Sequence, residues 1–140
     1  MALICDTGPL LAALDAADPD HLRCVDALSV VTEDLVVPAL VLAELDHWCM
    51  RRLPSVAWRV FLGDVVAGRY RVEHPTRADL ARCLELQERY ADLSLGVVDA
   101  SVIALAERLD EPKVATLDER HFRTVRPSHV PALRIVPDVA

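Results

Sequence analysis

The N-terminal stretch Leu3-Ile4-Cys5-Asp6-Thr7-Gly8-Pro9-Leu10 constrains the fold of this chain more than any other part of it. An apolar run over residues 2–5 ends at the carboxylate of Asp6, and Gly8-Pro9 then turns the chain into a second apolar segment, 10–14. Proline fits the first position of a helix and glycine tolerates the turn before it, so the pattern predicts a strand, an acid and a helix in succession. Strands that lead into helices build parallel sheets, and the sites of such sheets lie at the carboxyl ends of the strands. We therefore expect Asp6 to lie at a functional site.

The rest of the chain alternates between short apolar strands and longer amphipathic helices. Asp18 and Thr76 are expected to cap helices, Thr76 in a capping box with Asp79. Val56, Val60 and Phe61, together with Trp58, are expected on the inner side of one helix. The alternation predicts an α/β fold, a three-layer α/β/α sandwich with a mostly parallel sheet, in a single domain over residues 1–140. Further strands are predicted at 34–38, 70–73, 113–117 and 134–136, and further helices at 19–29, 39–52, 54–68, 76–90 and 97–109.

The composition indicates a protein with apolar surface left for a partner. Of the 140 residues 53% are hydrophobic, and the mean hydropathy of +0.25 is high for a monomer. The longest apolar stretch, 35–45, is too short to span a membrane and is interrupted by Pro38 and Glu44. The N-terminus has neither a basic region nor an apolar signal core, so we expect a cytoplasmic protein that does not contact the membrane.

Charge and cysteine content exclude several classes of protein. The four cysteines are widely separated and lie in apolar or helical contexts, which favours reduced buried thiols over a zinc site or a disulfide scaffold. A net charge of −7 argues against a protein that coats nucleic acid electrostatically, although it allows an enzyme whose acids are screened by cations. Two Trp, two Tyr and two Phe are too few for a single-strand-binding platform.

Two acids interrupt apolar helix faces. Glu44 lies within the stripe of Val41, Leu45 and Trp48, where an unpaired carboxylate costs several kcal/mol or becomes protonated. It could instead border the stripe and pair with Arg51, Arg52 or another base. Asp99 shares a face with Val102, Ile103 and Ala106, yet an acid in a first helical turn also complements the helix dipole.

Asp118 follows the strand that ends at Leu117 and could simply cap a short helix through Phe122. Asp6 has the weakest structural explanation, because Gly8 is better placed to cap a helix that begins at Pro9. Together the acids are more informative, since carboxylates gathered in a cleft repel one another unless a cation lies between them. Oxygen ligands select hard cations such as Mg²⁺ or Mn²⁺, which can activate water against a phosphodiester.

Four segments spread over nearly the whole chain carry a resemblance to a known family. The chain resembles PIN-domain ribonucleases and, within them, the toxins of VapBC toxin–antitoxin pairs. Each motif alone is weak, and four in the family's order are specific. The segments are Cys5-Asp6-Thr7-Gly8-Pro9-Leu10-Leu11, Pro38-Ala39-Leu40-Val41-Leu42-Ala43-Glu44-Leu45, Gly96-Val97-Val98-Asp99-Ala100-Ser101-Val102 and Ala115-Thr116-Leu117-Asp118-Glu119-Arg120-His121-Phe122.

The resemblance implies a metal-dependent endoribonuclease that hydrolyses RNA and is the toxin of a toxin–antitoxin pair. It implies Mg²⁺, with Mn²⁺ as the alternative, as cofactor, a homodimer, and a cognate antitoxin whose tail blocks the cleft. Thr116 is implied as polar support for the cluster and Asp92 as an outer ligand. The catalytic and metal-binding residues implied are Asp6, Glu44, Asp99 and Asp118.

Other polar and aromatic residues are expected to be structural or exposed. His121 has a possible ligand spacing from Asp118, but we expect it on the solvent side of a short helix, and Trp48 in the core or in a dimer contact. Arg120, Arg123 and Arg126 form a local basic patch that either contacts RNA phosphates or is a solvated face.

Three alternative functions are weighed. A phospho-accepting receiver domain needs adjacent acids after the first strand and a lysine at the end of the last, whereas Thr7-Gly8 follows Asp6 and Lys113 begins its strand. A haloacid-dehalogenase-like phosphatase needs an acid where Gly8 stands. A non-catalytic PIN-fold binding module would not need the complete acidic set.

Overall fold

A five-stranded, all-parallel sheet forms the centre of the protein in a computed structural model that describes residues 1–29 and 32–138. The strand order is β3-β2-β1-β4-β5, so the chain builds outward from β1 in one direction and then returns to its other side. The predicted three-layer α/β fold is confirmed, and the sheet is parallel throughout. The strands are β1 (Ala2–Cys5), β2 (Asp34–Pro38), β3 (Arg71–Glu73), β4 (Lys113–Ala115) and β5 (Arg134–Val136).

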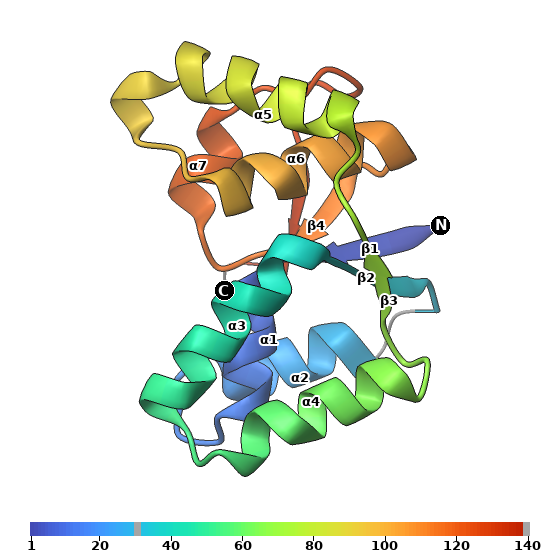
Figure 1. The fold of residues 1–140 in the computed structure, drawn as a ribbon, viewed down its shortest axis with the longest axis vertical. Coiled ribbons are helices and arrows are strands. Elements are labelled where there is room, and N and C mark those ends of the chain that lie inside the picture. The colour runs from blue at the N-terminus through green and yellow to red at the C-terminus, as the bar shows by residue number, and fades with distance from the viewer. Residues whose placement is uncertain (30–31, 139–140) are drawn as a thin grey trace.

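Helices cover the sheet on both sides. Figure 1 shows α5, α6 and α7 on one side of the strands and α1 to α4 on the other. The helix α6 packs against β1 and β2, and every residue from Ala100 to Ala106 is buried. The helices are α1 (Thr7–Leu14), α2 (His21–Ser29), α3 (Ala39–Arg52), α4 (Val56–Val66), α5 (Arg77–Arg89), α6 (Val97–Leu109) and α7 (Glu119–Thr124), with a short 3₁₀ helix η1 (Ala91–Leu93).

The pairing of β1 with β4 positions the functional end of the sheet. Every residue of β1 is buried, as expected of a central strand covered on both faces. Cys5 is in register with Ala115, and the backbone N–H of Asp6 donates to the carbonyl of Ala115 at 2.8 Å. The residues that follow the two strands, Asp6 and Thr116, therefore emerge side by side. This edge is also where the strand order reverses, which is the usual position of a binding crevice in open α/β sheets.

Helix starts differ from the predictions at two places. The first helix begins at Thr7, so Asp6 and not Gly8 occupies its N-cap position. The second begins at His21 because Asp18 first forms a local turn, in which its carboxylate accepts the backbone N–H of Asp20 at 2.7 Å. The capping box of Thr76 with Asp79 is confirmed.

The inner face of α4 was predicted only in part. Phe61 is buried as expected, and it packs between Trp58 and Tyr70 with ring centroids 5.8 and 5.0 Å away. Val56 and Val60 instead point outward, each 53% exposed, so that expectation was wrong. The aromatic contacts select the stripe through positions 58, 61 and 65, and this stripe excludes the two valines.

All four cysteines are buried free thiols, as predicted. Burial raises the pKa of each one, to about 12 for Cys5 and about 11 for Cys24, so these groups stay protonated and act as small apolar side chains. Within the described residues, none of the helices has the length and apolar character needed to cross a membrane.

Candidate active site: a carboxylate cleft at the ends of β1 and β4

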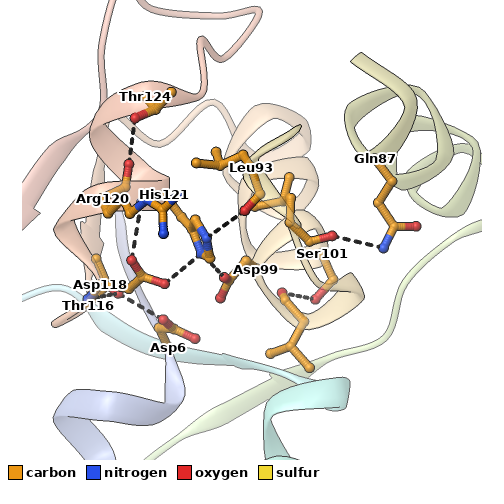
Figure 2. Close-up of polar contacts among 12 residues, drawn as sticks. Asp6, Gln87, Leu93, Asp99, Ser101, Thr116, Asp118, Arg120, His121 and Thr124 are labelled. Atoms are coloured by element: carbon orange, nitrogen blue, oxygen red, sulfur yellow. Dashed lines mark hydrogen bonds and ion pairs between the residues drawn. The ribbon is translucent and has the colours of Figure 1, made fainter. Parts of the chain in front are cut away.

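Asp6 lies at the N-cap of α1 without capping it. Its side chain makes no hydrogen bond to the backbone of the helix; instead Oδ2 accepts the hydroxyl proton of Thr116 at 2.8 Å (Figure 2). The other carboxylate oxygen, Oδ1, is buried and has no hydrogen-bond partner among the described residues. A buried acceptor without a donor is costly and calls for an explanation. The capping explanation for this acid is therefore absent.

The environment of Asp6 disfavours its charge. Burial, followed by the nearby charges of Asp99 and Glu44, raises the pKa of Asp6 from 3.8 to about 7. The hydrogen bond from the Thr116 hydroxyl acts in the opposite direction, lowering the pKa of Asp6, and does not compensate. Acids far apart in the sequence thus lie close enough to repel one another. A cation placed among them would remove that penalty.

Asp99 and Asp118 are joined by the imidazole of His121. Nδ1 of His121 lies 2.8 Å from Oδ2 of Asp99 and 2.7 Å from Oδ2 of Asp118, while Nε2 lies 3.2 Å from the carbonyl of Leu93 (Figure 2). When both acids are ionised all three partners are acceptors, and this arrangement favours an imidazole that carries a proton on each ring nitrogen. Burial works against that charge, but the hydrogen bond to Asp99 and the charge of Asp118 prevail, and the pKa of His121 is raised.

The pKa of Asp99 is also raised, chiefly by burial, although the hydrogen bond from His121 lowers it. The two directions are compatible because Asp99 faces Asp118 and Glu44 as well as the imidazole. The expectation that His121 lies on the solvent side of α7 was wrong. Its side chain is only 19% exposed, because Asp118 caps α7 by accepting the N–H of His121 at 3.1 Å and so turns the ring toward Asp99.

Thr116 ties the ends of the arrangement together. It is 1% exposed; its hydroxyl donates to Asp6 and accepts the backbone N–H of Asp118 at 3.0 Å. One side chain thereby orients the acid after β1 and the loop that carries the acid after β4.

Glu44 reaches the site from α3, which begins directly after β2. The carboxylate is half-buried, and no arginine, including Arg51 and Arg52, forms an ion pair with it in the part of the chain that the structure describes. One and two turns further along, Trp48 and Arg52 continue the same wall. The pairing alternative weighed for Glu44 is therefore not observed.

The four predicted acids line one cleft of about 390 Å³. They come from two strand ends and two helices, and the structure brings all of them together. Oxygen donors of several carboxylates around an orphaned buried oxygen fit a divalent cation, and Asp99, Asp118 and His121 offer ligand atoms within 4.8 Å of one another. The cleft is lined by Asp6, Thr7, Gly8, Leu11, Glu44, Trp48, Arg52, Asp99, Leu117 and Asp118.

One further acid and the basic patch that the sequence indicated lie outside this lining. Asp92 is exposed on η1, and the arginines of the basic patch are exposed on or just after α7, where Arg123 pairs with Glu119 at 2.9 Å. Conversely, Trp48 and Arg52 line the cleft although neither was predicted there. Their spacing of four and eight residues from Glu44 was the signal available in the sequence.

Comparison with known proteins places the chain in a family. The family model for the PIN domain matches residues 3–127. Ribonuclease VapC26 of Mycobacterium tuberculosis is 31% identical over 135 residues, which cover 96% of this chain and 100% of that protein. The chain therefore belongs to the PIN-domain family and is VapC-like, as the sequence motifs predicted. The receiver-like and phosphatase-like alternatives find no support.

Solved structures share the fold at lower identity. The crystal structure of M. tuberculosis VapC20, described as a sarcin-ricin loop cleaving toxin, has a TM-score of 0.78 at 19% identity and covers 84% of this chain and 91% of that one. VapBC2 from Rickettsia felis, bound to a promoter DNA fragment, gives 0.67 at 15% identity, with 96% and 97% covered. These likenesses support the fold.

Proposed function

We propose that the carboxylate cleft binds divalent cations, Mg²⁺ or Mn²⁺, through Asp6, Glu44, Asp99 and Asp118 and there hydrolyses phosphodiester bonds of RNA. The class of enzyme, a VapC-like PIN-domain ribonuclease, follows from the family match and the curated relative. The main support for a cation site is Oδ1 of Asp6, which is buried near the other acids and has no hydrogen-bond partner among the described residues.

The chain's own residues prepare the cleft for this chemistry. Cations bound there would supply charge stabilisation for the attacking and leaving oxygens and would lower the pKa of water. Thr116 holds the carboxylates of Asp6 and the Asp118 loop in place before any cation arrives. His121 holds Asp99 and Asp118 together and screens their repulsion.

Cleavage assays test the proposal directly. The purified protein should cut cellular RNA in Mg²⁺ or Mn²⁺, stop in EDTA, and recover when the cation is restored. Because hydrolysis by water does not use the ribose 2′-hydroxyl, the products should carry 5′-phosphates and no 2′,3′-cyclic phosphate. Cleavage by metal-free protein that is unaffected by EDTA would refute the metal site. Absence of any cleavage would favour the non-catalytic binding module.

Neutral variants separate the cleft from the rest of the surface. Asp99→Asn should lose activity by several orders of magnitude, because it removes a charge that both the cation and His121 use. Asp92→Asn is the matched control, since Asp92 is exposed and does not line the cleft. Equal activity of the two variants would contradict the assignment.

The proposed partners are an antitoxin and a second copy of the chain. Large apolar side chains are exposed on α4, with Val66 82% exposed, and on α5, with Leu84 58% exposed. Burying such surface stabilises an association, so sedimentation at micromolar concentration should give twice the chain mass of 15.5 kDa. A monomer that co-purifies with no partner would contradict the proposal that the exposed apolar side chains form an interface.

A further inference from the structure

One wall of the cleft carries a row of three different side chains. Glu44, Trp48 and Arg52 all line the cleft and are spaced four residues apart on α3. At 1.5 Å per residue, Trp48 lies about 6 Å and Arg52 about 12 Å along the helix from the acid. An indole and a guanidinium thus follow the carboxylate along one face of α3 within the lining of the cleft.

The aromatic and the cation are in direct contact. The guanidinium carbon of Arg52 lies 4.4 Å from the centroid of the Trp48 ring, and His47 meets that ring edge-on with centroids 5.2 Å apart. Trp48 is only half-buried, and Arg52 is exposed. Among the described residues Arg52 has no carboxylate within 4.0 Å. The cation is therefore preorganised against the ring and its charge is not neutralised.

We propose that Trp48 and Arg52 form a nucleotide subsite, in which an unpaired base of the RNA stacks on the indole–guanidinium pair and Arg52 binds an adjacent phosphate. This inference rests on the proposed function and adds a specificity element to it. Proteins recognise unpaired RNA bases by stacking them on aromatic rings and on guanidinium planes, which bind phosphate through the same group. The subsite binds and positions RNA and takes no part in the bond cleavage.

The chemistry of the cleft favours RNA as the occupant. The acids of the cleft, in a chain of net charge −7, repel the phosphates of RNA. The positive charge of Arg52 at the edge of the cleft would offset this repulsion by binding a phosphate. Trp48 is only half-buried and lines the cleft, so part of its ring is accessible to a ligand there. Contact with a protein partner is the competing outcome, and the experiments below separate the two.

Steady-state cleavage of an RNA that the parent cuts gives the first measurement. Trp48→Leu keeps an apolar side chain and loses the stacking plane, so KM should rise roughly five- to hundredfold with kcat little changed. Trp48→Phe should retain most of the affinity. Trp58→Leu is the matched control, because Trp58 is the only other tryptophan and packs on Phe61 of α4 away from the cleft.

Arg52→Gln and Arg51→Gln form a second matched pair, since both arginines are exposed at the end of α3 and only Arg52 lines the cleft. Arg52→Gln should weaken RNA binding and reduce the slope of log Kd against log salt concentration by about 0.7. Arg51→Gln should match the parent in both. Arg52→Lys should restore the slope but not the full affinity, because it keeps the charge and loses the planar group.

Fluorescence reports the contact without relying on turnover. In a protein carrying Trp58→Phe, to leave one tryptophan, and Asp99→Asn, to prevent cleavage, the emission of Trp48 should be quenched on titration with the same RNA in Mg²⁺. Fluorescence anisotropy of labelled RNA measures binding in parallel. Quenching that saturates with the anisotropy supports the subsite.

Two results would overturn the inference, and they are distinguishable. If RNA is bound and cut but Trp48 emission stays constant and the Trp48 and Arg52 variants keep the parent KM, the subsite is wrong and the proposed function stands. The pair would then be assigned to a protein contact. If the parent neither binds nor cuts RNA, the proposed function fails and the subsite fails with it.

Discussion

At the scale of single residues, Thr116 is the point on which the site depends. Its hydroxyl donates to Asp6 and accepts from the backbone of Asp118, so it links the ends of two neighbouring strands with one buried group. Position 116 follows β4 directly, and the register of β4 with β1 places Thr116 beside Asp6. The sequence alone could suggest a supporting threonine there but not both of its bonds.

Replacing Thr116 by Val should show what the hydroxyl contributes. The shape is kept while Asp6 loses a donor and the Asp118 N–H loses an acceptor, so the free energy of unfolding should fall by about 1–3 kcal/mol. Cleavage should fall as well, because Asp6 and Asp118 lose their orientation. Thr116→Ser retains the hydroxyl and should stay near the parent in both. Urea unfolding and RNA cleavage measure the two effects; a Val variant indistinguishable from the Ser variant would contradict this role.

The acids of the site could be identified from the sequence, whereas His121, whose position depends on a tertiary contact, could not. Asp6, Glu44 and Asp99 each violated a local pattern, as an acid at a strand end or on an apolar face, and such violations are visible without coordinates. His121 violates nothing in its own segment. Its position depends on how α7 meets α6, which is a tertiary contact between residues 22 apart, so the expectation of a solvent-facing ring failed.

At the scale of elements, α5 shows a helix whose start was predictable because its signal is local. Thr76 accepts the N–H of Asp79 at 3.0 Å, and the Asp79 carboxylate accepts the N–H of Thr76 at 3.0 Å. Asp79 is 6% exposed and also pairs with Arg108 of α6 at 3.0 Å. The cap therefore joins α5 to the helix that carries Asp99.

Thr76→Ala should lower the free energy of unfolding by about 1 kcal/mol, since one N–H at the helix start loses its acceptor. Thr76→Ser should recover the loss. Neither variant should alter the KM for RNA, because Thr76 does not line the cleft. Thermal melting and cleavage kinetics check the pair. A change in KM without a change in stability would mean that α5 contributes to the site more directly than its contacts indicate.

Other element boundaries depended on tertiary structure. The strand predicted over 113–117 ends at Ala115, although the N–H of Thr116 still donates to the carbonyl of Val136 at 3.0 Å; beyond it the Thr116 hydroxyl accepts the N–H of Asp118. The outward rotation of Val56 and Val60 on α4 followed from aromatic contacts with Tyr70, a residue beyond the helix. Both features involve partners outside the local window, so periodicity alone could not identify them.

At the scale of the whole molecule, the fold gathers charge that opposes its own stability. The topology brings residues 6, 44, 99 and 118 to one cleft, where the pKa of Asp6 is raised to about 7 and that of Asp99 is also raised. A cation that binds only the folded state would offset the free-energy cost of this repulsion. Stability should consequently depend on pH and on metal together, and the sign of that dependence follows from the pKa directions.

In EDTA, the free energy of unfolding should fall as pH rises from about 4 to about 7. Asp6 in the folded state keeps its proton up to about pH 7, while its ordinary pKa is 3.8, so over this range the folded state binds more protons than the unfolded state. The loss is about 1.4 kcal/mol for each pH unit between the two pKa values. The raised pKa of His121 acts with the same sign but only above its ordinary pKa of 6.5, because its stabilising charge is lost as pH rises toward the folded value.

Asp6→Asn tests the origin of this dependence. The variant lacks the titrating group, so its unfolding free energy in EDTA should vary far less with pH than that of the parent, whatever its absolute value. Asp92→Asn removes an exposed carboxylate outside the cleft and should keep the parent slope. Mg²⁺ should flatten the parent curve and raise its melting temperature more than that of Asp6→Asn, since a bound cation favours the ionised acid. Urea unfolding across the pH range, with EDTA and with Mg²⁺, measures the free energies of unfolding, and thermal melting measures the stabilisation by Mg²⁺. A parent whose stability in EDTA rises from about pH 4 to about pH 7 would show that the acids are paired structurally rather than poised for a cation.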